Sequence, residues 1–185
     1  MKDLMQQDRR QLFKVLKERA FFKEKIILSS GKESNYYIDA RRATLTSEGA
    51  YLAAKVLLAM IKDVQFDAIG GPTLGADPMI GAIGVLCHQM GRPTNTFIIR
   101  KAPKAHGKQQ QIEGPPIPTG AKVILIDDVA TTGKAFLESL DVLEKQGIHA
   151  KKALCLVDRG EGAKEALAQR GCELISIFTA KEFLR

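Results

Sequence analysis

Five short runs of mostly apolar residues alternate with helix-like segments from residue 66 onward, and this alternation constrains the fold most strongly. The predicted strands are Phe66–Ile69, Thr96–Ile99, Val123–Ile126, Ala153–Val157 and Leu174–Ile177. The helices predicted between them are Gly75–Met90, Lys134–Gln146 and Ala163–Gln169. Apolar strands joined by helices indicate an α/β fold with a doubly wound, mostly parallel sheet covered on both faces. In such folds ligands bind at the carboxyl ends of the strands.

The first 61 residues have a different pattern. Leu4, Leu12, Phe13 and Leu16 recur at near-helical spacing and predict a first helix. Short strands are expected at Ile26–Leu28 and Tyr36–Ile38, with a turn between them at Ser29–Gly31. Thr46 or Ser47 can cap a helix that runs to about Ile61. The length of 185 residues fits one domain, residues 1–185.

Composition narrows the class of protein. A hydrophobic content of 45% is sufficient for a packed core. No apolar run approaches the roughly 20 residues that span a bilayer, and the N-terminus does not resemble a signal peptide. Cys87, Cys155 and Cys172 are odd in number and lie among apolar residues, which favours buried, reduced thiols. We therefore expect a cytoplasmic protein with no membrane partner. The three histidines lack zinc-like spacing, so we expect no metal site built from protein ligands alone.

The net charge of +7, from 28 basic and 21 acidic residues, favours an anionic partner. Nucleic acid and a polyphosphate metabolite are both candidates. Four cations and His106 lie between Arg100 and Lys108, with no acidic residue before Glu113. No row of aromatic residues accompanies them, which argues against binding of single-stranded nucleic acid. No nucleic-acid partner is expected.

The strand Val123–Ile126 leads directly into Asp127 and Asp128, and two carboxylates at the end of a buried strand are costly unless they are used. Small and hydroxylated residues follow, and such residues at the start of a helix form an anion site. Carboxylates beside a phosphate cradle suit a sugar phosphate. The spacing of a P-loop is absent. The alternative is a plain strand–turn–helix with solvated aspartates.

The segment Val123–Ala135 resembles the phosphoribosyl-pyrophosphate signature of the type I phosphoribosyltransferases. The resemblance implies the fold of that family. It also implies a small N-terminal hood at about residues 1–45 and a core sheet at about residues 62–178. The motif alone does not choose among purine, uracil, orotate and regulatory members.

The polar segment 100–119 is a second indication of function, because a loop of that length in a compact domain is usually functional or disordered. Its sequence Arg-Lys-Ala-Pro-Lys-Ala-His-Gly is similar to the mobile loop of orotate phosphoribosyltransferases. Ala102 stands where that family usually has Glu. Cations on a closing loop can stabilise a departing pyrophosphate. The alternative is ordinary solvated charge.

Three other stretches resemble the same family. Ser30–Asp39 is similar to its segment near the orotate ring, and Gly70–Ala76 to its glycine-rich pyrophosphate turn. Arg159 follows a strand, as the orotate-contacting arginine does there, and an arginine can clamp a carboxylate through two hydrogen bonds. Without the resemblance, Arg159 could be a surface ion pair and the two tyrosines ordinary packing. Ser29 stands where many members carry a lysine, and Gly70–Ala76 lacks a lysine that some members have there.

The resemblance implies specific residues and partners. Catalytic roles fall to Lys104, His106, Asp127 and Asp128. Phosphoribosyl pyrophosphate would contact Arg100, Lys101, Lys104, His106, Asp127, Asp128, Val129, Ala130, Thr131, Thr132, Gly133, Lys134 and Ala135. Orotate would contact Thr131, Arg159, Tyr36 and Tyr37.

The expected reaction transfers ribose 5-phosphate to orotate, giving orotidine 5′-monophosphate in pyrimidine biosynthesis, with Mg²⁺ held mainly by substrate oxygens. A homodimer is implied, with the loop Arg100–Glu113 shared across subunits. The alternatives are a purine or uracil phosphoribosyltransferase, and a non-catalytic RNA-binding regulator that senses nucleotides.

Overall fold

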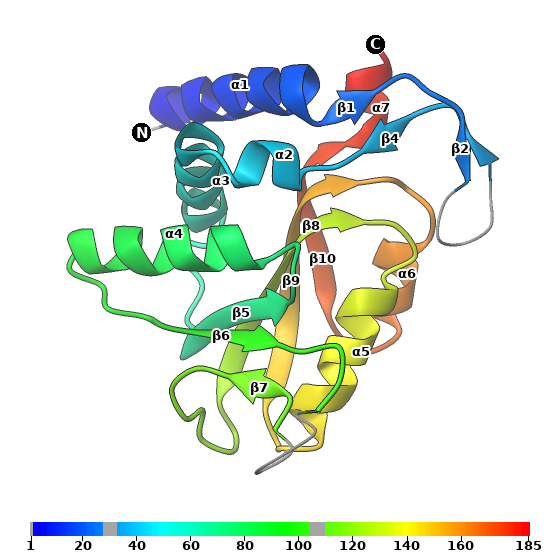
Figure 1. The fold of residues 1–185 in the computed structure, drawn as a ribbon. Coiled ribbons are helices and arrows are strands. Elements are labelled where there is room, and N and C mark those ends of the chain that lie inside the picture. The colour runs from blue at the N-terminus through cyan, green and yellow to red at the C-terminus, as the bar shows by residue number, and fades with distance from the viewer. Residues whose placement is uncertain (1, 28–32, 104–109) are drawn as a thin grey trace.

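A six-stranded sheet forms the centre of the computed structural model, which describes residues 2–27, 33–103 and 110–185 (Figure 1). Its strand order is β10-β9-β8-β5-β6-β7. The strands are β5 (Ala68–Pro72), β6 (Asn95–Ile99), β7 (Ile112–Glu113), β8 (Lys122–Ala130), β9 (His149–Asp158) and β10 (Glu173–Thr179). All neighbouring pairs are parallel except β6 with β7. The mostly parallel α/β sheet is therefore confirmed.

Two hydrophobic clusters lie on opposite faces of the sheet, because alternate side chains of each strand point to opposite sides. In β8, Ile124 and Ile126 belong to one cluster, whereas Val123 and Leu125 belong to the other. Helices α3 (Ser47–Met60) and α4 (Asp77–Gln89) complete the first cluster, together with α1 (Lys2–Arg19). Helices α5 (Lys134–Glu144) and α6 (Ala163–Ala168) cover the second.

The N-terminal residues form a layer above the carboxyl ends of β8 and β9 (Figure 1). This layer holds α1 and two small antiparallel pairs, β1 (Phe21–Phe22) with β4 (Tyr37–Ile38) and β2 (Ile26–Ile27) with β3 (Glu33–Ser34). The short helix α2 (Arg41–Thr44) follows.

The C-terminal helix α7 (Ala180–Leu184) fastens this layer to the core. The rings of Phe13 and Phe183 stack with centroids 4.7 Å apart. The Arg9 guanidinium donates to the Glu182 carboxylate at 2.6 Å and to the Ile177 carbonyl at 3.1 Å. These contacts hold the N-terminal layer in place over the sheet.

The helix boundaries agree closely with the expected ones. Thr46 caps α3, with its hydroxyl accepting a hydrogen bond from the Gly49 N–H at 3.1 Å. Cys87, Cys155 and Cys172 are free and buried, as predicted. Burial raises the pKa of the Cys155 thiol, and that of Cys172 to about 11, so both stay protonated. Among the described residues, no helix combines the length and the apolar character needed to cross a membrane.

Some boundaries predicted from the sequence were wrong. Strand β8 continues through Asp127 and Asp128 to Ala130, because β9 continues beside it and pairs Asp158 with Ala130. Strand β7 lies inside the segment predicted to be all loop, and α2, β1, β3 and α7 were not expected. The predicted turn Ser29–Gly31 lies outside the described residues.

Candidate active site

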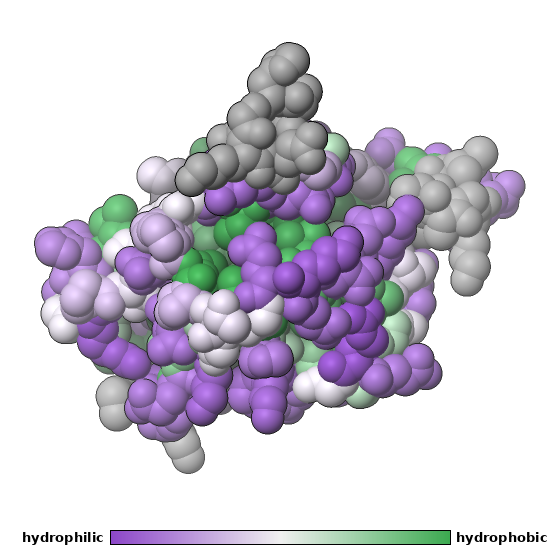
Figure 2. Space-filling view, turned by 90° about the horizontal axis from the view of Figure 1, so that it is seen from below, coloured by the Kyte–Doolittle hydropathy of each residue, from purple (hydrophilic) through white to green (hydrophobic). Residues whose placement is uncertain are grey.

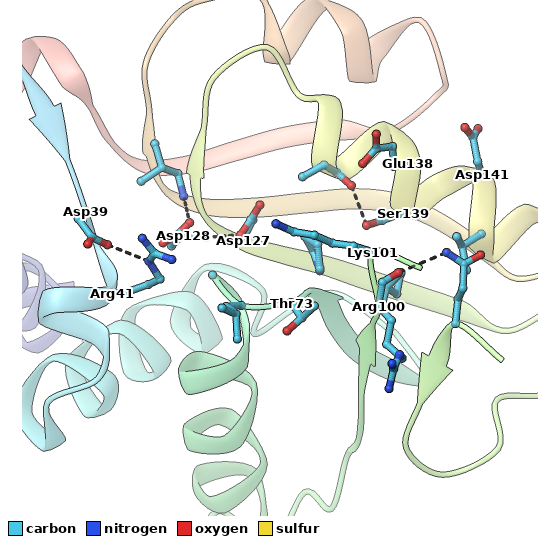
Figure 3. A pocket seen from close by; sticks show the side chains of 18 of the residues that line it. Asp39, Arg41, Thr73, Arg100, Lys101, Asp127, Asp128, Glu138, Ser139 and Asp141 are labelled. Atoms are coloured by element: carbon cyan, nitrogen blue, oxygen red, sulfur yellow. Dashed lines mark hydrogen bonds and ion pairs between the residues drawn. The ribbon is translucent and has the colours of Figure 1, made fainter. Parts of the chain in front are cut away.

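A cavity of about 580 Å³ opens between the N-terminal layer and the carboxyl ends of β5, β6 and β8 (Figure 3). Its wall combines acidic, basic and hydroxyl side chains from five separate segments of the chain. The polar side chains that line it include Tyr37, Asp39, Arg41, Thr73, Arg100, Lys101, Asp127, Asp128, Glu138 and Ser139. Figure 2 views the molecule from below Figure 1 and shows mostly hydrophilic surface around a smaller apolar area.

Asp127 and Asp128 form the acidic centre of the cavity. Asp127 is only 8% exposed, and its Oδ1 accepts the Asp128 N–H at 2.9 Å. The Asp128 Oδ1 accepts the Val129 N–H at 2.7 Å. Burial raises the pKa of Asp127 well above its usual range, and the neighbouring Asp128 charge raises it further. Burial also raises the pKa of Asp128, but the Val129 N–H and the Arg41 charge oppose that rise. The pair is therefore costly to ionise fully without a cationic or hydrogen-bonding ligand.

The turn between β5 and α4 lies directly against the acidic pair. A Cβ atom at Gly75 would lie 2.5 Å from Asp127 Oδ1 and 2.6 Å from Asp128 Oδ1. The Thr73 hydroxyl donates to Asp77 Oδ2 at 2.8 Å and fixes the turn at the start of α4. Gly70 and Gly71, predicted as part of this turn, belong instead to β5. A Cβ there would lie 2.2 Å from the Phe97 carbonyl oxygen or 1.9 Å from that of Ile126.

The predicted phosphate cradle is the turn from Thr131 to Gly133 together with the start of α5. Gly133 is the N-cap residue with φ +82°, and no side chain caps the helix. The first N–H groups of α5 are therefore available to an anion, which the helix dipole also favours. The side chain of Lys134 is exposed, and its Nζ lies 3.8 Å from Glu138 Oε1, one turn along the helix.

Two of the four predicted basic loop residues lie at the cavity. Arg100 and Lys101 line it just after β6 (Figure 3). The Arg100 guanidinium lies 3.4 Å from Glu113, and its backbone N–H donates to the Gln111 carbonyl at 2.8 Å. These contacts join the two ends of the predicted mobile loop. Lys104 and His106 lie outside the described residues.

Arg159 lies beyond the end of β9, beside the same carboxyl edge. Its side chain is only 4% exposed, which excludes the surface ion pair considered from the sequence. The guanidinium lies 4.5 Å above the Tyr36 ring, and its backbone N–H donates to the Ala130 carbonyl at 2.9 Å. Two of the four predicted orotate contacts, Arg159 and Tyr36, therefore touch each other, and a third, Thr131, directly follows Ala130, whose carbonyl accepts the Arg159 N–H. The fourth, Tyr37, lines the cavity.

Several cavity residues were not found from the sequence. Asp39 and Arg41 pair at 2.9 Å, which raises the pKa of Arg41, and Figure 3 shows them beside Asp128. Ser139 lies on the cavity side of α5, and its hydroxyl donates to the Ala135 carbonyl at 2.8 Å. Asp39 had a signal in the sequence, because it ends the stretch Ser30–Asp39 that resembles the family's segment near the orotate ring, whereas Arg41 had only its position just after that stretch.

This fold and cavity define a class of enzyme. Residues 45–182 match the model of the phosphoribosyl transferase domain. That range includes β5 to β10 and the whole segment Val123–Ala135.

Comparison with individual proteins narrows the class. The orotate phosphoribosyltransferase of Corynebacterium glutamicum strain R is 42% identical over 163 residues, 88% of this chain and 86% of that protein. That of Rhodopirellula baltica is 35% identical, with 98% of this chain and 96% of that protein covered. The structure of Mycobacterium tuberculosis orotate phosphoribosyltransferase with Fe(III) dicitrate has a TM-score of 0.83 and 35% identity, covering 95% of this chain and 98% of that one. The complex of the same enzyme with 5-phospho-alpha-D-ribosyl 1-diphosphate has a TM-score of 0.79 and 31% identity, covering 96% and 99%. The chain belongs to the orotate phosphoribosyltransferase family.

Proposed function

We propose that this enzyme transfers ribose 5-phosphate from phosphoribosyl pyrophosphate to orotate, giving orotidine 5′-monophosphate and pyrophosphate. The observation that carries the proposal is the buried pair Asp127 and Asp128 beside an uncapped helix start. Carboxylates that accept hydrogen bonds from ribose hydroxyls, next to N–H groups that bind a phosphate, match the two ends of a ribose 5-phosphate.

The donor would lie along β8 and the start of α5. The 5-phosphate takes the N–H groups of Thr131–Ala135, and the ribose hydroxyls face the acidic pair. Arg100 and Lys101 also line the cavity, and their charges suit a pyrophosphate group. Lys104 and His106 would neutralise or protonate that group as it leaves.

The acceptor would lie beneath the N-terminal layer, where Arg159 pairs with the orotate carboxylate. Tyr36 and Tyr37 would border the ring, and Thr131 would contact the same acceptor from the phosphate turn. Uracil and the purine bases carry no carboxylate. The buried position of Arg159 therefore favours orotate over both alternative acceptors.

In the reaction the orotate ring nitrogen attacks C1′ and forms a C–N bond as the C–O bond to pyrophosphate breaks. Pyrophosphate leaves with the electrons of the broken C–O bond, and the proton of the attacking nitrogen passes to solvent water. Positive charge develops on the sugar, so ionised Asp127 and Asp128 stabilise the transition state. The energetic cost of ionising this buried pair is offset only when the cationic sugar or a metal ion is beside it.

The site is compatible with Mg²⁺ held mainly through substrate oxygens. Among residues 2–27, 33–103 and 110–185, no three His, Cys, Asp or Glu side chains are grouped so as to bind a metal. Gly75 lets the turn between β5 and α4 pass close to the two carboxylates without covering them with a side chain. Mg²⁺ in that region would be bound by Asp127 or Asp128 together with substrate oxygens, and would neutralise charge on the pyrophosphate.

We also infer a homodimer in which the loop Arg100–Glu113 serves the neighbouring site. Leu45 and Leu74 are 73% and 63% exposed and line a second pocket that shares Asp39, Arg41 and Leu74 with the site. Large exposed apolar side chains are typical of contact surfaces. The three buried, reduced cysteines support a cytoplasmic location.

The test is an absorbance assay of orotate with phosphoribosyl pyrophosphate and Mg²⁺, with and without a chelator. We expect orotate to disappear only when all three are present. Asp128→Asn should slow the reaction by about 100-fold or more, because it removes one charge from the transition state. The proposal is wrong if folded wild-type protein consumes no orotate.

A further inference from the structure

Arg159 is enclosed on three sides by groups from two separate segments of the chain. Its Nε donates to Glu161 Oε1 at 2.7 Å, and its Nη2 donates to the Ser34 hydroxyl at 3.2 Å. One face of the guanidinium is covered by the Tyr36 ring, with Cζ 4.5 Å from the ring centroid. Within the described part of the chain, Nη1 has no hydrogen-bond partner.

These contacts leave one direction for a ligand. A guanidinium can bind a carboxylate along its Nε edge or across its two terminal nitrogens. Glu161 already occupies the Nε edge. An incoming carboxylate must therefore approach the terminal nitrogens, of which Nη2 is directed by Ser34. The orientation of Arg159 is set before a ligand arrives, which lowers the entropy lost on binding.

The backbone around Glu161 holds its carboxylate in place. The flanking residues Gly160 and Gly162 have φ values of +72° and +102°, which only glycine adopts readily. The Gly160 N–H donates to Asp158 Oδ1 at 2.8 Å and closes the turn. Glu161 is therefore presented from a tight turn of defined shape.

Glu161 keeps one oxygen without a partner, although that atom is buried. Its Oε2 has no hydrogen bond among the described residues. A pair that served stability alone would gain by having Nη2 donate to Oε2, because an unsatisfied buried acceptor is costly. Here Nη2 is directed to Ser34 of the N-terminal layer instead. The arrangement favours a fixed orientation of Arg159 at the expense of a second ion-pair hydrogen bond.

We propose that Glu161 is a positioning residue that makes the site selective for an acceptor bearing a carboxylate. It acts through Arg159 and touches neither substrate. This inference rests on the proposed function, since it assigns the Arg159 terminal nitrogens to the orotate carboxylate. Glu161 also offsets the charge of the buried guanidinium through their ion pair.

The test uses Glu161→Gln, a neutral variant of nearly the same shape, alone and together with Arg159→Ala. Steady-state assays give kcat and the KM of each substrate, and uracil is tested as a competitive inhibitor. Glu144→Ala is the matched control, because Glu144 forms a comparable ion pair with Arg170 at 2.7 Å on the exposed surface. Thermal unfolding confirms that each variant is folded.

We expect Glu161→Gln to raise the KM for orotate by about tenfold, because a loosened guanidinium loses its alignment. The KM for phosphoribosyl pyrophosphate, kcat and uracil inhibition should change by less than about twofold, since none involves the orotate carboxylate. In the Arg159→Ala background, Glu161→Gln should have no further effect on the KM for orotate.

Four results would overturn the inference. An unchanged KM for orotate in Glu161→Gln would show that Arg159 does not need Glu161. Equal losses for both substrates, or a loss that persists without Arg159, would show a general structural role. Absence of orotate turnover by the wild-type protein would refute the proposed function itself, and the inference with it.

Discussion

Gly75→Ala tests whether the close approach of the turn between β5 and α4 to the acidic pair is needed for catalysis. The added methyl would lie 2.5 Å from Asp127 Oδ1 and 2.6 Å from Asp128 Oδ1, whereas ordinary contact begins at 3.4 Å. The carboxylates or the turn must therefore move by about 0.8–0.9 Å. Gly75 is not among the glycines with positive φ, so alanine adds no backbone strain and the effect is steric.

A displacement of that size at reacting groups costs about 100-fold in rate, and overpacking of the turn costs about 1–3 kcal/mol of stability. We therefore expect kcat/KM for orotate transfer to fall by about 100-fold while the protein stays folded. Gly81→Ala, in the middle of α4, is the control, because its Cβ would meet no atom within 4 Å. That variant should retain full activity and gain about 0.5–1 kcal/mol of stability. A Gly75→Ala enzyme with activity close to wild type would refute the steric argument.

Three other perturbations have defined outcomes. Because burial raises the pKa of Asp127 well above 3.8, the folded state holds that proton more tightly than the unfolded chain. The stabilisation that protonated Asp127 contributes to the free energy of unfolding is therefore fully present at pH below about 4. It is lost as the pH rises through the raised pKa of Asp127. Asp127→Asn should flatten this decline in urea titrations without substrate, and an unaltered pH profile would contradict the assignment. Lys104→Ala should reduce turnover far more than orotate binding. If the loop serves the neighbouring subunit, mixing the Lys104→Ala and Asp128→Asn proteins should restore activity, because some mixed dimers then hold one intact site. No restoration would contradict a shared loop. Thr46→Ala should lower the free energy of unfolding by about 1 kcal/mol, as measured by urea denaturation, because it removes the cap of α3.

The part of the fold that could be predicted from sequence is the part determined by local pattern. Strands such as Val123–Ile126 are apolar runs that must be buried, and α5 begins directly after a glycine. The extension of β8 to Ala130 could not be predicted in this way, because it depends on pairing with Asp158 of β9. Strand β7 likewise exists only through its pairing with Ile98 and Ile99.

Helix α7 is a different case, because its signal was present in the sequence. Thr179 and Glu182 form a capping box, in which each side chain accepts a hydrogen bond from the other's backbone. The Thr-x-x-Glu spacing could have predicted the start of that helix. Its short length left too little periodicity for the apolar pattern to be recognised.

The candidate site likewise contains residues that can be recognised from the sequence and residues that only folding brings together. Asp127, Asp128 and the turn to Ala135 are contiguous, so their chemistry can be recognised in one segment. Asp39, Arg41 and Ser139 join them only through folding, and no spacing along the chain links the three. The burial of Arg159 was also invisible in the sequence, because Glu161, Ser34 and Tyr36 enclose it from two separate segments.

The choice of acceptor is the central claim, and a competition experiment tests it most directly. The protein is incubated with phosphoribosyl pyrophosphate, Mg²⁺ and equal concentrations of orotate, uracil and adenine, and the nucleotides formed are identified by mass spectrometry. We expect orotidine 5′-monophosphate as the only product. Formation of uridine or adenosine monophosphate in its place, or of no nucleotide at all, would contradict the assignment.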